Sequence, residues 1–197
     1  MIGALDVNAN LPCSTLLSVR RLSDAARGRM RPDMNVRRYL DALLEDGLPA
    51  DAVDVLCHVL PKRYAIGWAL ECLQADGAPE RNPVDRSALA TVQRWLQDPS
   101  EDNRRAAMEL ADRLHYDSAG AWLAAAAGWS GGSLAPADLP EVKPSPVLSG
   151  EAVAAALKVS AASKGSDFTG ALRGFIDRAL ATFGLPEPGG EPGDDQP

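Results

Sequence analysis

The sequence predicts an all-α protein, a single orthogonal or hairpin-stacked bundle of seven to eight short helices with disordered termini. The chain of 197 residues is rich in alanine and holds only 5% aromatic residues, which disfavours a β-sheet. Its apolar residues recur at three- and four-residue spacing, the period of a helix with one buried face. We expect a helical domain over residues 34–184, between a flexible Arg-rich arm (1–33) and a disordered acidic tail (185–197).

Residues that favour helix ends separate eight apolar-periodic segments. Asp33 or Asn35 is a suitable N-cap for the first helix, and Ser149 for the seventh. Asn82-Pro83 and Asp98-Pro99 combine a capping side chain with a proline suited to the first turn. The expected helices span about 36–46, 49–59, 61–75, 83–97, 99–115, 117 or 118 to 131, 150–163 and 167–183.

The segment 133–148 between the sixth and seventh expected helices is rich in proline. Four prolines in sixteen residues exclude a helix and favour an extended connection of polyproline type. The pair Gly131-Gly132 precedes it, and we expect positive φ there to end the sixth helix.

The net charge of the chain is −7, which disfavours a nucleic-acid partner because phosphate binding needs clustered cations. The charge is uneven. Residues 1–38 hold seven arginines and three aspartates, a net +4, and the remainder carries −11. A solvated basic arm explains this pattern, and so does an arm that docks on an acidic partner or on the body of the protein.

The sequence also indicates the compartment. Three cysteines, Cys13, Cys57 and Cys72, are too few and odd in number for a disulfide framework. No apolar run approaches the length of a membrane helix, so we expect no membrane insertion, and the N-terminal segment lacks the pattern of a signal peptide. We therefore expect a bacterial, cytoplasmic protein.

The motifs of common catalytic and cofactor sites are missing from the sequence. It contains neither phosphate-binding glycine motif and no CxxC or HxxxH pair, so we expect no cofactor and no metal. The loop Ser130-Gly131-Gly132-Ser133 follows a helix and differs from the GxSxG elbow, which joins a strand to a helix. Cys57 and His58 are adjacent and point about 100° apart on a helix. A hydrolase-like enzyme using either group remains the alternative to a protein without catalytic residues.

Several motifs between Leu60 and Leu157 resemble an uncharacterised bacterial family of helical proteins. They are Leu60-Pro61-Lys62-Arg63 before Trp68, Trp95-x-x-Asp98-Pro99-Ser100-Glu101-x-Asn103-Arg104-Arg105-Ala106-Ala107, Ala121-Trp122-Leu123-Ala124, Trp129-Ser130-Gly131-Gly132-Ser133-Leu134-Ala135-Pro136 and Val142-x-Pro144-x-Pro146. The run from Trp129 to Pro136 is the most specific. The resemblance implies no assigned activity and supplies no catalytic residues. It implies a loose association with gene neighbourhoods of bacterial secretion systems, type VI among them.

These observations favour a non-catalytic protein that binds another protein, as an adaptor, chaperone-like or accessory protein. Tryptophan is common in the centre of protein interfaces, although the four tryptophans also suit a core. Three interpretations are open for the adjacent Arg104 and Arg105 near the start of the fifth helix. They are solvated, they bind carbonyls at helix ends, or they recognise a carboxylate. A self-assembling structural protein is a further alternative. The expected partner-binding residues are Trp129, Ser130, Gly131, Gly132, Arg104 and Arg105.

Overall fold

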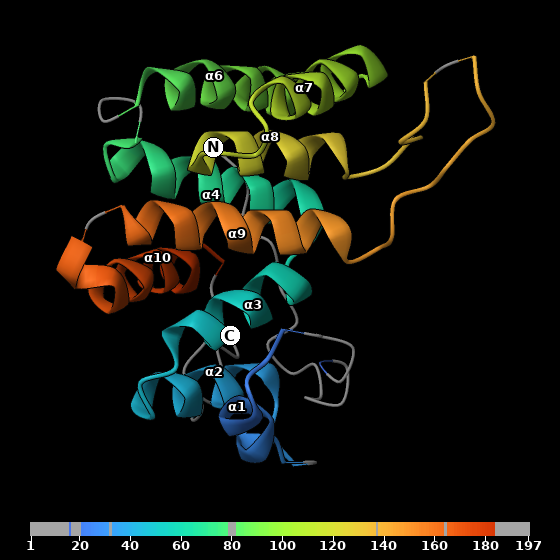
Figure 1. Cartoon of the computed structure of the whole chain (residues 1–197). Helices are drawn as coiled ribbons and strands as arrows, with labels where there is room; N and C mark the ends of the chain where they lie inside the picture. The colour runs from blue at the N-terminus through green and yellow to red at the C-terminus, as the bar shows by residue number, and fades with distance from the viewer. Residues whose placement is uncertain are drawn as a thin grey trace, which may run out of the picture.

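The computed structural model describes residues 16, 21–31, 33–78, 82–136, 138–163 and 165–183. These residues form nine α-helices and no β-strand, which confirms the predicted all-α bundle (Figure 1). The helices are α1 (Asp24–Arg29), α2 (Val36–Glu45), α3 (Pro49–Val59), α4 (Lys62–Ala75), α6 (Pro83–Gln97), α7 (Glu101–Arg113), α8 (Ala119–Gly128), α9 (Leu148–Ala162) and α10 (Phe168–Phe183), with a short 3₁₀ turn η2 (Gly165–Asp167) before the last. No helix in this part of the chain combines the length and apolar character needed to cross a bilayer.

Helix α8 lies at the centre of one half of the bundle. It packs most extensively against α9 and α7, then α6 (Figure 1). Its sequence AGAWLAAAAG is apolar all round, and every residue except Trp122 is buried. A helix without a polar face is stable only when other helices surround it, so its composition accounts for its place.

The small side chains of α8 let neighbouring helices approach unusually closely. A Cβ atom built on Gly128 would lie 2.7 Å from the Cα of Met108 on α7. The backbones of α7 and α8 are therefore in direct contact at this point, and only glycine fits without a shift of one helix.

The predicted caps Asn35 and Asn82 are confirmed, and Ser118, one of the two residues predicted to start the sixth helix, is also a cap. The side chains of Asn35, Asn82 and Ser118 accept hydrogen bonds from backbone N–H groups in the first turns of α2, α6 and α8. Each of these caps acts within its own turn, which is why local sequence was sufficient to find it.

Two predicted caps are wrong because other parts of the fold use those residues. Asp98 ends α6, with its N–H donating to the carbonyl of Arg94, so α7 begins at Glu101 after Ser100. Ser149 lies inside α9 and is buried, where its hydroxyl donates to the carbonyl of Ala126 on α8 (2.8 Å). This side chain bonds to a neighbouring helix instead of capping its own.

Part of the predicted flexible arm is helical and packed on the body. Ser23 caps α1, and its N–H and hydroxyl donate to the carboxylate of Asp51 on α3 (2.7 and 3.1 Å). Ala26 is buried, and its carbonyl accepts from the hydroxyl of Tyr39 (2.7 Å). Residues 1–15, 17–20 and 32 of the predicted arm, and the predicted tail 185–197, lie outside the described residues.

Two of the four tryptophans belong to the core. Trp68 and Trp95 are buried, and the indole N–H of Trp68 donates to the carbonyl of Phe175 on α10 (2.9 Å). Trp122 and Trp129 are only partly buried. Trp122 and Trp129 nevertheless pack against the core, so the predicted core role holds for Trp68 and Trp95 and the interface role of Trp129 stays a prediction.

The close contact of α7 and α8 gives a first prediction. We expect Gly128→Ala to lower the free energy of unfolding by about 1–3 kcal/mol, because the added methyl group forces the two backbones apart. Urea unfolding followed by circular dichroism measures the change. Gly174→Ala on α10 is the matched control, since its Cβ meets no atom within 4 Å and alanine favours a helix by about 0.5–1 kcal/mol. An unchanged stability of Gly128→Ala would contradict the direct backbone contact.

Candidate functional site

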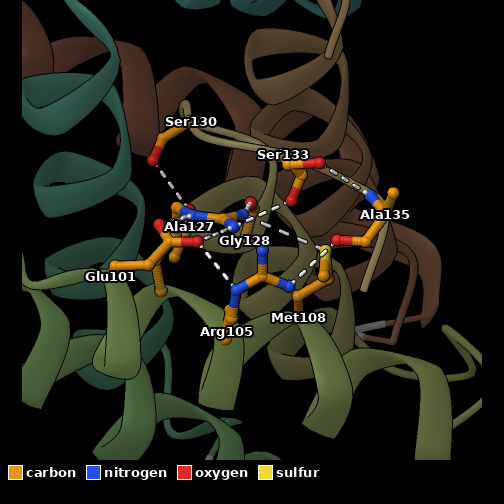
Figure 2. Close-up of polar contacts among 9 residues, drawn as sticks. Glu101, Arg105, Met108, Ala127, Gly128, Ser130, Ser133 and Ala135 are labelled. Carbon is orange, nitrogen blue, oxygen red and sulfur yellow. Dashed lines mark hydrogen bonds and ion pairs between the residues drawn. The ribbon is translucent and has the colours of Figure 1, made fainter. Parts of the chain in front are cut away.

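The candidate site is the connection between α8 and α9, residues 129–147, called the α8–α9 loop below. It projects from the bundle at the end where α8 stops and α9 begins (Figure 1). Four of the six predicted partner-binding residues begin this loop, Trp129 to Gly132. The other two, Arg104 and Arg105, lie on α7 beside its base (Figure 2).

Arg104 joins α7, the end of α8 and the loop. Its guanidinium makes two hydrogen bonds to the carboxylate of Glu101 (both 2.7 Å). It also donates to the carbonyl of Gly128, the last residue of α8, and to the carbonyl of Ser133 (2.9 Å) (Figure 2). The side chain is buried. A cation at the carbonyl end of a helix is favourable, and here it replaces the hydrogen bonds that the helix end lacks.

Arg105 fixes the next part of the loop. It donates to the carbonyl of Ala135 (3.1 Å) and forms an ion pair with Glu101 (2.8 Å). Of the three interpretations given to this arginine pair, binding of a carbonyl at a helix end holds for Arg104, and the solvated one is wrong for this buried side chain. Both arginines bind a carboxylate, that of Glu101. One carboxylate thus orients two guanidinium groups, which together hold three backbone carbonyls.

The hydroxyls of the serine-glycine loop bind backbone groups. Ser130 donates to the carbonyl of Ala127 (2.7 Å). The Ser133 hydroxyl accepts from the N–H groups of Ala135 and Val142 (both 3.1 Å). Both side chains therefore shape the loop.

The proline-rich part of the loop closes on itself. The N–H of Leu134 donates to the carbonyl of Val142 (2.8 Å), and the hydroxyl of Ser133, which accepts from the N–H of Val142, joins the same two segments of the loop. Between these two segments, the N–H of Leu139 donates to the carbonyl of Pro136 (3.1 Å). This bond closes a turn. The prolines keep the described residues of 133–147 out of a helix, as predicted, and the hydrogen bonds across the base turn the segment back on itself before α9 begins at Leu148.

Gly132 has φ of +60°, whereas Gly131 does not have positive φ. A Cβ on Gly132 would lie 2.8 Å from Nε of Arg104 and from Oε2 of Glu101, while one on Gly131 would meet no atom within 4 Å. Of the predicted pair, only Gly132 needs the conformation and the space that glycine provides, because the buried arginine lies against it.

Trp129 belongs to a partly buried aromatic cluster that the sequence did not reveal. Its ring centroid is 5.7 Å from that of Tyr116 and 6.4 Å from that of Trp122. Tyr116 and His115 both have positive φ, so the turn between α7 and α8 is strained. Burial, and then a hydrogen bond to Asp112, raises the pKa of Tyr116 to about 12.

The most exposed apolar side chains of the loop were also missed. Leu139 is 55% exposed and Val142 is 52% exposed. Periodicity analysis assigns apolar residues to buried faces and has no rule for single ones among prolines.

A lysine also holds the base of the loop. Lys62 was noted only within a motif, and its ammonium group donates to the carbonyl of Ser130 (2.9 Å).

The alternative enzyme residues Cys57 and His58 line a cavity of about 360 Å³ between α3, the start of α4 and the start of α9. Burial raises the pKa of the Cys57 thiol well above its ordinary value, which keeps it protonated at neutral pH. The thiolate is the reactive form of cysteine, so this environment opposes its use as a nucleophile. Among the described residues, no three side chains of His, Cys, Asp or Glu form a group that could hold a metal ion.

The two glycines give a second prediction. We expect Gly132→Ala to lower the free energy of unfolding by about 1–3 kcal/mol, because it combines unfavourable φ with a clash against Arg104. Gly131→Ala is the control and should stay within about 0.5 kcal/mol of the wild type. Chemical denaturation of both variants measures this, and equal effects would contradict the geometry of the loop base.

The arginine cluster gives a third prediction, on pH. The hydrogen bond from Arg104 holds the pKa of Glu101 below its ordinary value of 4.5. A carboxyl group with a lowered pKa in the folded state adds stability above its ordinary pKa and loses it as the pH falls through the lowered one. The stability difference between wild type and Glu101→Gln should therefore be largest above pH 4.5 and shrink below it.

Urea unfolding at pH values from 3 to 7 follows this difference. Glu109→Gln, an exposed position further along α7, controls for the loss of one negative charge. A difference that stays constant as the pH falls would show that the carboxylate of Glu101 adds no stability through its ionised form.

Comparison with known proteins adds a family to this description. The chain matches none of the curated proteins and none of the solved structures. Residues 39–183, from the first half of α2 to the end of α10, match a family of unknown function, DUF6931. The match includes α7, α8 and the whole α8–α9 loop, and it fits the resemblance to an uncharacterised family. The chain belongs to the DUF6931 family.

Proposed function

We propose that the protein is a non-catalytic adaptor that binds another protein through the α8–α9 loop. The observation that carries this proposal is the exposure of Leu139 and Val142 on a loop whose base is held by buried hydrogen bonds. Water disfavours exposed apolar side chains, and a partner that covers them recovers that free energy.

The anchored base makes the loop suitable for binding. Arg104, Arg105 and Lys62 together hold four backbone carbonyls, from Gly128 to Ala135. A loop that is already ordered loses less conformational entropy on association than a flexible one, which favours affinity. The loop is a small projecting surface, of the kind that inserts into a groove of the partner.

The predicted binding residues take two different roles in this proposal. Arg104 is 4% exposed and its donors are engaged within the chain, so it positions the loop. Trp129 and the segment 130–132 are more accessible and form the side of the contact surface. Leu139 at the turn of the loop and Val142 at its hydrogen-bonded base supply the exposed apolar part of this surface.

The protein is proposed to act without catalysis, as an accessory protein of a bacterial secretion system in the cytoplasm. The bound hydroxyls of Ser130 and Ser133 and the protonated thiol of Cys57 support the absence of catalysis. The secretion setting rests on the resemblance of the motifs alone. An enzyme and a self-assembling protein are the alternatives that the experiment below distinguishes.

The fourth prediction tests the exposed apolar side chains of the loop. We expect the double variant Leu139→Asp, Val142→Asp to lose the bound partner, because two carboxylates replace the apolar contacts. Isotope-labelled affinity purification from the native host compares this variant with the wild type. The matched control is Val159→Asp on α9, another exposed valine (38%) away from the loop, which should retain the partner.

Both variants should keep the stability of the wild type within about 0.5 kcal/mol, since they alter exposed positions. Proteins retained equally by the wild type and by the loop variant would refute the proposal. Analytical ultracentrifugation tests the self-assembly alternative by measuring the oligomeric state of the wild type and of both variants. A dimer in the wild type that is lost only in the loop variant would identify a second copy of the chain as the partner.

A further inference from the structure

A cavity of about 360 Å³ opens between α3, α4 and α9, apart from the exposed apolar side chains Leu139 and Val142 of the α8–α9 loop. Most of its lining is apolar. The volume is within the range of small-molecule sites, and apolar walls with a few polar groups are their usual composition. The apolar residues that line it are Val59, Leu60, Pro61, Pro146, Val147 and Ala154.

Two helices begin at this cavity with their positive ends toward it. Helix α4 starts at Lys62 after Pro61, and α9 starts at Leu148 after Val147. Neither start has a side-chain cap. The N–H of Leu148 donates to the carbonyl of Ser145, so the partial positive charge on this side of the cavity comes from the dipoles of the two helices.

Lys62 adds a full positive charge at the same place. Its ammonium group is partly buried and donates to the carbonyl of Ser130 (2.9 Å). An ammonium group has three donors, so this bond leaves it able to bind a ligand.

The two carboxylates that line the cavity, Asp54 and Glu151, each have a positively charged side chain beside them. Both oxygens of Asp54 accept from the ammonium group of Lys158 (2.7 Å each). Glu151 lies 4.0 Å from Arg21 at the rim. Among the described lining residues, Lys62 is thus the lysine or arginine that has no carboxylate partner.

These charges favour a ligand with one negative charge. The last turn of α3 also lines the cavity and presents partial negative charge, so the anion belongs on the side of α4 and α9. A dianion such as phosphate would face Glu151 and Asp54 with only one unpaired lysine. A carboxylate matches this balance, and an attached aliphatic chain matches the apolar wall.

We propose that this cavity binds an aliphatic carboxylate, with the carboxylate at Lys62 and the aliphatic part against the apolar wall. This chemistry is shared by a short fatty acid and by the C-terminal residue of a polypeptide. The proposal shares Lys62 with the base of the α8–α9 loop, but the exposed loop residues Leu139 and Val142 do not line the cavity, so either proposal can fail alone.

The test uses the full chain, labelled with ¹⁵N, and two carboxylate probes. Hexanoate represents the fatty acid, and N-acetyl-Gly-Gly-Leu represents a polypeptide C-terminus. Hexanamide and the C-terminal amide of the same peptide are the neutral controls. We expect saturable shifts of the amide signals of Lys62 and Gly150 with at least one carboxylate probe, and affinity at least tenfold lower for its amide.

The two probes distinguish the sources of the ligand. Binding of the peptide alone assigns the site to a polypeptide C-terminus, binding of hexanoate alone assigns it to a fatty acid, and binding of both supports the shared chemistry. No saturable shift with either carboxylate, or equal binding of the amides, would overturn the proposal.

Two variants locate the binding. Lys62→Met should weaken carboxylate binding at least tenfold, whereas Lys143→Met, on an exposed lysine of the loop, should leave it unchanged. Ala154→Leu fills the cavity from α9 and should also abolish binding. Wild-type affinity in both folded variants would place the ligand elsewhere and refute the site. The comparison of acid and amide on the wild type keeps the test decisive if either variant fails to fold.

Discussion

The structure depends on a helix whose side chains are almost all no larger than a methyl group. Because α8 carries little bulk, α6, α7 and α9 approach its backbone closely and bury it on every side. One consequence concerns its end. The carbonyl of Gly128 stops inside the molecule, where water cannot easily replace the hydrogen bond that a helix end lacks.

Arg104 donates the hydrogen bond that the carbonyl of Gly128 needs, and the same side chain connects the end of α8 to the α8–α9 loop. A guanidinium group has five donors in one plane, so the side chain that satisfies Gly128 also reaches Ser133 and Glu101. The order of the α8–α9 loop therefore follows from the burial of α8. A flexible connection would need no such cluster, and a lysine could not hold the same set of carbonyl and carboxylate groups at once.

The base of the loop also connects the two surfaces for which we propose ligands. Lys62 holds the carbonyl of Ser130 and lines the cavity between α3, α4 and α9. Pro146 and Val147 end the loop and form another wall of that cavity. Lys62, Ser130 and Pro146, which belong to three of the segments that motivated the family resemblance, thus lie at one end of the bundle. The match to the family of unknown function, over residues 39–183, includes all of the segments that motivated the resemblance.

The sequence by itself determined the all-α class, the approximate bounds of eight of the nine helices and the caps Asn35 and Asn82, because periodicity and capping act within one or two turns. It also directed attention to Trp129–Gly132 and to the arginine pair. Only the tertiary structure decided that Ser149 bonds to α8, that Ser23, the cap of α1, bonds to Asp51 on α3, and that the arginines hold carbonyls of the loop. These contacts join residues distant in sequence, and a side chain with several donors binds whichever acceptors the packed helices bring to it.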